Sequence, residues 1–266
     1  MRDLKGQVAI VTGASSGIGR ATAERFAAEG MRVVLGARRV ERLAGVADGI
    51  QRMGGTARAM ETDVTRPDHV GRLVEEAVIA FGRVDVLVNN AGLGYFGPVE
   101  STPASEARYL FDVNVMGTLY GIQAVVPVMR RQKRGHIINV ASIVGKRATP
   151  GNGLYSATKF AQVALSESLR LEVRSAGIRV SIVCPVSTTT EFFEVAGARS
   201  PMKLTAAGPT FSPEQVAAAI VQCVRRPRPE VMIYRPARFL VVLNALAPRL
   251  VDRILGAVWK KMRPGL

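Results

Sequence analysis

The sequence predicts a single domain of the α/β class, in which a parallel sheet is covered by helices on both faces. A length of 266 residues and an apolar content of 48% suit one domain with one sizeable core. Short β-branched runs alternate with longer segments of helical apolar spacing, such as Ile18–Ala28, Val70–Phe81 and Tyr155–Ala176. The strand candidates are Val8–Thr12, Arg32–Ala37, Thr56–Glu61, Val84–Val88, His136–Val140, Arg179–Cys184 and Val231–Tyr234.

The first strand candidate leads into a glycine-rich turn, TGASSGIG, at residues 12–19. Glycine allows a tight turn and lets the backbone approach a phosphate closely, and the helix that follows presents free N–H groups to an anion. The spacing G-x-x-x-G-x-G differs from the common dinucleotide fingerprint. Its place between a strand and a helix nevertheless predicts a pyrophosphate cradle rather than a turn that binds nothing. The residues expected to form the cradle are Gly13, Ser15, Ser16, Gly17, Ile18 and Gly19.

The second strand candidate is followed by Arg38 and Arg39. A carboxylate at this strand end would hold the adenosine ribose hydroxyls of NAD and repel a 2′-phosphate. Two guanidinium groups stand there instead, and their donor geometry matches a phosphate. This strand end therefore favours NADP(H) as cofactor. The alternative is that the arginines are solvated residues at the start of the next helix.

The third and fourth strand candidates are also followed by polar or small residues. Asp63 can accept a hydrogen bond from an adenine amine, or it can cap the helix that follows Pro67. The amide and small residues at positions 89–92 allow a ribose to approach the backbone closely, although alone they would indicate only a turn. Besides Asp63, the predicted cofactor contacts here are Val64, Asn90, Ala91 and Gly92.

Tyr155 and Lys159 open a long helical pattern, and their i, i+4 spacing places both side chains on one helix face. A lysine charge beside a phenol favours the phenolate, so Tyr155 is a candidate acid and base for a substrate oxygen. Ser142 follows the fifth strand candidate and can polarise the same oxygen from a second direction. Asn114 interrupts the helical pattern Tyr109–Val126, in which asparagine is a poor helix former.

With these residues in this order, the chain resembles the short-chain dehydrogenase/reductase family over roughly residues 6 to 234. The resemblance implies a Rossmann-type, doubly wound sheet of seven parallel strands and a homodimer or homotetramer. It also implies a catalytic tetrad with a water-linked proton path, NADP(H) preference where arginine occupies position 38, and nicotinamide contacts from Tyr155 and Lys159. The tetrad would consist of Asn114, Ser142, Tyr155 and Lys159.

The segment after the sixth strand candidate departs from the family pattern. The family usually has Pro-Gly followed by a threonine, whereas this chain has Val186 after Pro185. Valine does not readily adopt a positive φ, so this loop is expected to follow a different path. Pro185, Thr188 and Thr190 are still expected to contact the cofactor.

The function expected from these residues is hydride transfer between NADP(H) and a carbonyl or secondary alcohol, with Tyr155 as the acid and base. An apolar substrate is expected beneath a lid at about residues 190–212. The alternatives are an epimerase or dehydratase on the same fold, and a sensor or scaffold that binds dinucleotide without turnover. The apolar lid residues are Phe192, Phe193, Val195, Met202, Leu204 and Phe211.

Residues 236–266 form a basic tail that the family pattern does not explain, after a catalytic domain at residues 1–235. The formal net charge is +15, and no nucleic-acid-binding motif accompanies it. Arg249–Met262 has the periodicity of an amphipathic helix, whereas the run Phe239–Ala247 is too short to span a bilayer. The tail, through residues 239–262, is therefore expected either to contact an anionic membrane or to pack against a second subunit.

The remaining composition indicates a cytoplasmic protein, with the tail as a candidate contact with the inner face of a membrane. Met1 lies close to the first strand candidate, which leads us to expect no signal peptide. Cys184 and Cys223 lie in apolar contexts without metal-ligand spacing, so we expect two buried free thiols and no metal site.

Overall fold

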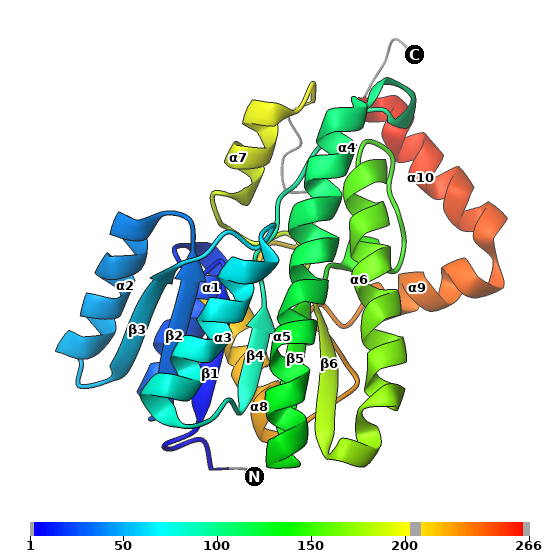
Figure 1. Cartoon of the computed structure of the whole chain (residues 1–266). Helices are drawn as coiled ribbons and strands as arrows, with labels where there is room; N and C mark the ends of the chain where they lie inside the picture. The colour runs from blue at the N-terminus through cyan, green and yellow to red at the C-terminus, as the bar shows by residue number, and fades with distance from the viewer. Residues whose placement is uncertain (1–2, 203–208, 263–266) are drawn as a thin grey trace.

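The computed structural model describes residues 3–202 and 209–262, with side chains described as far as residue 260. Seven parallel strands form one sheet in the order β3-β2-β1-β4-β5-β6-β7 (Figure 1). The predicted fold class is confirmed, and every strand candidate corresponds to a strand whose ends lie within two residues of those expected. The strands are β1 (Val8–Thr12), β2 (Arg32–Ala37), β3 (Thr56–Glu61), β4 (Val86–Asn89), β5 (Gly135–Val140), β6 (Ile178–Cys184) and β7 (Glu230–Met232).

Helices cover both faces of the sheet, as expected for parallel strands joined by crossovers. One hydrophobic cluster packs α1 (Gly17–Ala28), α2 (Val40–Arg52) and α8 (Pro213–Arg225) against one face. A second cluster packs the other face against α3, α5 and α6. The bounds of these three helices are Pro67–Phe81 for α3, Gly117–Gln132 for α5 and Gly153–Glu172 for α6.

The helical pattern around Asn114 is longer than predicted and contains an irregularity. Helix α4 (Ala104–Phe111) runs into a π-helical segment, Asp112–Met116, which continues directly into α5. A π-helical turn inside a helix displaces the backbone hydrogen-bonding pattern by one residue and is frequent at functional sites. The expected break of the helix at Asn114 is thus a change of helix type.

The order of the strands reverses beside β1. From β1 the chain proceeds outward through β2 and β3, and then returns to place β4 on the other side of β1. Ligands of open parallel sheets bind at such a switch point, beyond the carboxyl ends of the strands. The residues between β1 and α1, and those after β4, meet at this point.

The last part of the chain consists of α9 (Ala237–Leu246) and α10 (Pro248–Met262), at the right of Figure 1. Helix α7 (Phe192–Arg199) lies beyond the carboxyl end of the sheet. Among the described residues, no helix is both long and apolar enough to cross a membrane. Short 3₁₀ helices lie at Val99–Ser101, Ile143–Gly145 and Arg174–Ala176.

A buried carboxylate at the amino end of the strands, just before β4, provides a test of this arrangement. Asp85 is 4% exposed and accepts hydrogen bonds from the Val8 N–H at 3.0 Å and from Arg83 and Arg134 at 2.8 Å each. Because Asp85→Ala would leave a buried donor without a partner, we expect it to lower the free energy of unfolding by about 2 kcal/mol in urea denaturation. Asp68→Ala, which removes only exposed ion pairs, should lower the free energy of unfolding much less than Asp85→Ala does. Equal losses in the two variants would contradict the assignment.

Candidate active site

One large cavity lies at the carboxyl end of the sheet, with a volume of about 900 Å³. Residues after β1, β2, β4, β5 and β6 all contribute to its wall. Every predicted cofactor and catalytic residue lines this cavity except Gly19 and Asn114, which lie behind its wall. The sequence-predicted site is therefore brought together in one place.

The glycine-rich turn is packed so closely against the end of β4 that side chains would not fit. A Cβ on Gly13 would lie 2.9 Å from the Ala91 Cα, and one on Gly19 would lie 2.3 Å from the Gly13 carbonyl oxygen. Gly13 also has a φ of +66°, a conformation that glycine adopts without strain. The Ser16 side chain does not cap α1, so the first N–H groups of that helix remain available to an anion. The turn thus fits a dinucleotide pyrophosphate.

Hydrogen bonds fasten this turn to the end of β4. The Thr12 hydroxyl accepts from the Asn90 N–H at 3.0 Å and from the Ala91 N–H at 3.1 Å. The Asn90 side-chain amide donates to the Thr12 carbonyl at 2.9 Å. The predicted ribose-contacting segment and the predicted phosphate cradle therefore form one rigid unit.

The arginines after β2 have different partners. Arg38 donates to the Tyr109 hydroxyl at 2.6 Å, and its side chain is on the cavity wall. Arg39 precedes α2, but its guanidinium turns toward the glycine-rich turn, where it donates to Ser16 at 2.7 Å and to Ser15 at 3.2 Å. The alternative, in which the arginine is only a solvated residue at the start of the next helix, therefore does not describe the Arg39 side chain.

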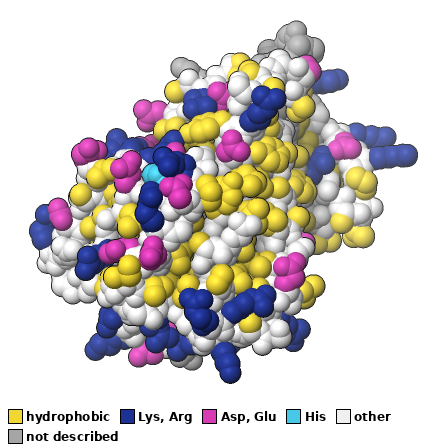
Figure 2. Space-filling model, in the orientation of Figure 1, with side chains coloured by type: hydrophobic (Ala, Val, Ile, Leu, Met, Phe, Trp, Pro, Cys, Tyr) yellow, Lys and Arg dark blue, Asp and Glu magenta, His cyan; other side chains and the backbone are white. Residues whose placement is uncertain are grey.

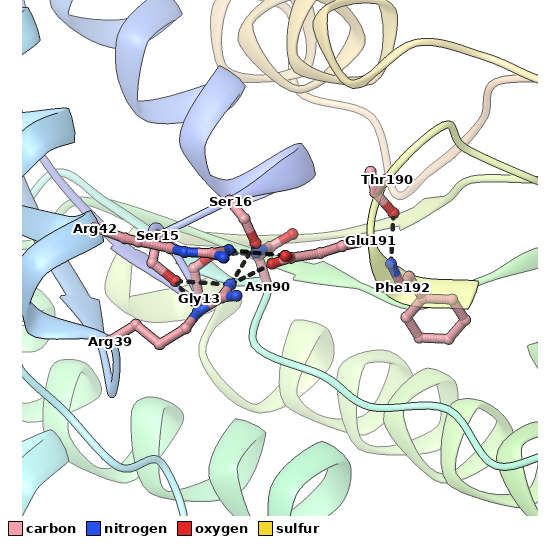
Figure 3. Close-up of polar contacts among 9 residues, drawn as sticks. All are labelled: Gly13, Ser15, Ser16, Arg39, Arg42, Asn90, Thr190, Glu191 and Phe192. Carbon is pink, nitrogen blue, oxygen red and sulfur yellow. Dashed lines mark hydrogen bonds and ion pairs between the residues drawn. The ribbon is translucent and has the colours of Figure 1, made fainter. Parts of the chain in front are cut away.

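Glu191 was not predicted, and it is the main ionic partner of this region (Figure 3). Its carboxylate pairs with Arg39 and accepts from Arg42 at 2.8 Å. Hydrogen bonds from Arg39 and Ser16, together with Arg42, hold the pKa of Glu191 at about 2. Glu191 therefore joins the loop after β6 to the end of β2 and to the cradle. The one feature of the sequence that pointed to Glu191 was its position directly after Thr190, a predicted cofactor contact.

Asp63 is held by the backbone that follows it. Its carboxylate accepts hydrogen bonds from the Thr65 N–H at 3.0 Å and from the Thr65 hydroxyl at 2.8 Å. The residue at the N-cap position of α3 is Arg66. Burial opposes ionisation of Asp63, but the Thr65 hydrogen bonds and the Arg38 charge leave its pKa below the usual value. Asp63 is therefore an ionised acceptor on the cavity wall rather than the cap of α3.

Ser142, Tyr155 and Lys159 lie side by side in the cavity. Ser142 follows β5, and Tyr155 and Lys159 lie in the first two turns of α6. The Lys159 ammonium lies 5.5 Å from the centre of the Tyr155 ring and donates to the Val140 carbonyl at 3.1 Å. The helix spacing and the strand end thus place the three side chains together in the cavity, as the sequence predicts.

Burial dominates the ionisation of both titratable groups. It raises the pKa of Tyr155, against a smaller opposing effect of the hydrogen bond with Ser142, and it lowers the pKa of Lys159 to about 7. The sequence pattern predicted that the lysine charge would lower the pKa of the phenol. In the structure the cost of desolvating each charge sets the direction of both pKa shifts.

Asn114 acts at the back of the site. Its side chain accepts from the Leu93 N–H at 2.8 Å and donates to Thr158 at 3.0 Å, so it fastens the loop after β4 to α6. Its backbone carbonyl accepts a hydrogen bond from the Thr118 hydroxyl at 2.8 Å.

A chain of side-chain hydrogen bonds connects Lys159 to this carbonyl. Lys159 donates to Gln162 at 2.8 Å, and Gln162 donates to the Thr118 hydroxyl at 2.7 Å. All three side chains are buried. Sequence reasoning missed Gln162 and Thr118, because polar residues inside helices carry no signal of a shared network.

The loop after β6 accommodates valine without a left-handed backbone. Lys133 is the one described non-glycine residue with a positive φ, so Val186 does not adopt the conformation that a glycine would allow. The Thr188 hydroxyl donates to the Val186 carbonyl at 3.0 Å. Thr190 lies against the cradle, with its methyl carbon 3.0 Å from where a Gly17 Cβ would be.

The residues of the predicted lid meet Tyr155. The Phe192 ring lies 5.3 Å from the Tyr155 ring, and Phe96 stacks on Phe193 at 5.9 Å. Phe192, Phe193 and Val195 line the cavity, whereas Leu204 lies outside the described residues. The inner part of the cavity is therefore aromatic and apolar.

Comparison with known proteins gives the same family. The model of the short chain dehydrogenase family matches residues 7–200. The chain belongs to the short-chain dehydrogenase family. An uncharacterised oxidoreductase of Staphylococcus saprophyticus is 45% identical over 194 residues, which cover 72% of this chain and 78% of that protein.

Two solved structures superpose closely on the chain. A short-chain dehydrogenase from Burkholderia phymatum in complex with NAD has a TM-score of 0.86 at 31% identity, covering 94% of this chain and 96% of the other. An alcohol dehydrogenase from Thermococcus sibiricus complexed with 5-hydroxy-NADP has a TM-score of 0.76 at 30% identity, covering 85% and 95%. The protein is thus a short-chain dehydrogenase with an NAD(P)-binding fold, and its relatives include both NAD and NADP complexes.

The low pKa of Lys159 makes the stability of the protein depend on pH. Between pH 7 and 8.5 the unfolded chain keeps this lysine protonated, whereas the folded protein without cofactor releases the proton. The unfolded state then binds more protons, so the free energy of unfolding should rise with pH by about 1 kcal/mol per pH unit relative to Lys159→Met. Urea denaturation of both proteins at several pH values measures this. If the difference in free energy of unfolding between the two proteins does not change with pH, Lys159 stays charged in the folded protein.

Proposed function

We propose that the protein is an NADP(H)-dependent oxidoreductase that transfers a hydride between the nicotinamide and a carbonyl or secondary alcohol of an apolar substrate. The observation that supports this proposal best is the position of Ser142, Tyr155 and Lys159 in the same cavity as the glycine-rich cradle. We assign this activity to residues 1–235. The cytoplasmic location expected from the sequence remains a prediction.

Each polar side chain has a separate role in the proposed reaction. NADP(H), when bound, supplies or accepts the hydride. The Tyr155 phenol donates a proton to the substrate oxygen in reduction and removes it in oxidation. The Ser142 hydroxyl donates a hydrogen bond to the same oxygen and stabilises its developing charge. The Lys159 ammonium stabilises the phenolate that is left after proton donation.

The raised pKa of Tyr155 keeps the phenol ready to donate a proton. At neutral pH the phenol is fully protonated, which is the form that proton donation requires. An alkoxide is a stronger base than a phenolate, so the phenol still protonates it. Gln162 and Thr118 connect Lys159 to the Asn114 backbone carbonyl and hold the lysine in place, and we propose that a water molecule restores the proton to Tyr155.

The preference for NADP(H) rests on the guanidinium groups at the end of β2. Arg38 and Arg39 both line the cavity, and Arg39 already binds the Glu191 carboxylate. A 2′-phosphate is a stronger and more highly charged acceptor than a carboxylate. We therefore propose that the phosphate competes with Glu191 for Arg39.

We also propose a homodimer or homotetramer. A band of hydrophobic side chains lies over α4, α5 and α6 in Figure 2. Phe111 is 37% exposed and Phe160 is 43% exposed in this region, and large exposed apolar areas of this kind mark protein interfaces.

Replacing Tyr155 with phenylalanine separates catalysis from cofactor binding. The variant keeps the ring and its contact with Phe192 but has no proton to transfer. We expect its kcat to fall by about 10³-fold while NADPH binding, measured by fluorescence titration, changes less than about threefold. Turnover that survives in the variant would refute the proposed role. A biological effect that persists without turnover would favour the sensor alternative.

Replacing Arg38 or Arg39 with alanine tests the choice of cofactor. Either variant should bind NADPH about tenfold more weakly or worse, because it loses charge-assisted hydrogen bonds to the 2′-phosphate. NADH has no such phosphate, so its affinity should change less than about threefold. Arg52→Ala, at the far end of α2, is the matched control and should leave both affinities unchanged. Wild-type protein that binds NADH as tightly as NADPH would contradict the proposed preference.

A further inference from the structure

Helix α10 carries more apolar surface than the body of the protein covers. Its apolar residues come in adjacent pairs that recur at helical spacing, so two parallel stripes run along it. The inner stripe faces the body: Val251 is fully buried, and the Trp259 ring would lie 3.1 Å from a Cβ on Gly151. Asp252 borders this stripe and pairs with Arg147 of the body at 2.5 Å. The orientation of α10 on the body is therefore fixed.

The outer stripe of α10 is left in solvent. Leu250, Ile254 and Val258 occupy every fourth position and are 47%, 47% and 48% exposed. Large apolar side chains exposed in a continuous row, rather than singly, indicate a surface that binds something.

Helix α9 adds a second exposed stripe. Phe239, Val242 and Leu246 recur at helical spacing and are 72%, 55% and 80% exposed. The two helices follow each other with only Ala247 between them. Six large apolar side chains are thus exposed within a segment of twenty residues, 239–258.

Basic residues border these stripes. Arg249, Arg253 and Lys260 fall on one side of α10 and are exposed, and Arg235 and Arg238 lie at the start of α9. The described part of the tail after residue 234 has Asp252 as its one acid, and that acid is paired with Arg147. In Figure 2 the right edge of the molecule shows basic and hydrophobic side chains together. An apolar stripe with a basic border matches the headgroup region of an anionic bilayer.

The same helices form part of the cavity wall. Leu240 of α9 and Leu255 and Val258 of α10 line the cavity, on the side away from the cradle. Val258 also belongs to the exposed outer stripe. The apolar surface of the tail is therefore continuous with the apolar lining of the substrate region.

We propose that α9 and α10 dock on an anionic membrane surface, with Phe239, Leu246, Leu250 and Ile254 in the interfacial region of the bilayer. Docking in this way brings Val258, which both lines the cavity and is exposed, to the lipid surface, so that an apolar substrate can enter without crossing water. This last step rests on the proposed function, whereas the docking itself does not.

Charge favours a membrane over a second copy of the chain. A twofold interface through this surface would bring the two basic borders together, and like charges in contact are unfavourable. The apolar band over α4–α6 offers a different surface for self-association.

Co-sedimentation with vesicles tests the docking without any substrate. Wild-type protein should bind vesicles of phosphatidylcholine with 30% phosphatidylglycerol at low salt, with a partition coefficient at least tenfold above that for pure phosphatidylcholine. Two double variants should each lower vesicle binding at least tenfold. One is Phe239→Glu/Ile254→Glu, and the other is Arg249→Gln/Arg253→Gln. Ile79→Glu, at a 74% exposed position on α3, is the matched control and should bind as wild type. Thermal unfolding of each variant verifies that it is folded.

Two outcomes would overturn the proposal. One is wild-type protein that stays in the supernatant with anionic vesicles at low salt. The other is that wild-type protein self-associates and that the double variant Phe239→Glu/Ile254→Glu does not. That result would assign the exposed stripes to an interface with a second copy of the chain. Tyr155→Phe should bind vesicles as wild type does, so a failure of the proposed catalytic function leaves this result unaffected.

Discussion

The Thr12 hydroxyl, which accepts hydrogen bonds from the Asn90 and Ala91 backbone, joins the ends of the two central strands. The rest of the site depends on this junction. It fixes the glycine-rich turn against the end of β4 at a distance that only glycine at position 13 permits. The glycine-rich turn, the segment after β4 and helix α6 are then positioned by one rigid sheet.

Burial controls the chemistry of the site as much as the choice of residues does. Lys159 loses water on entering the core and receives the Val140 carbonyl and Gln162 in exchange. These neutral partners do not fully compensate, which is why its pKa falls to about 7. The same desolvation keeps the Tyr155 phenol protonated. The π-helical segment at Asp112–Met116 places Asn114 where its side chain can fasten the loop after β4.

Much of the fold was predictable because its signals are local. Most strands are short runs rich in β-branched residues, and the glycine-rich turn lies between a strand and a helix. Tyr155 and Lys159 meet because they are one helical turn apart. Glu191 could not be predicted as a partner of Arg39, since 152 residues separate them and only the sheet brings the two loops together. The pKa directions were also not predictable, because they depend on burial rather than on sequence spacing.

The sequence by itself determined the order of the elements, the residues at each strand end and the amphipathic period of the tail, because each follows from neighbours within a few positions. The tertiary structure decided which side chains share a cavity, which charges are desolvated and which stripe of α10 faces the body. Those outcomes depend on contacts between distant segments. Val251 and Leu250 are adjacent apolar residues in the sequence, yet one is buried and the other exposed because only one side of α10 meets the protein.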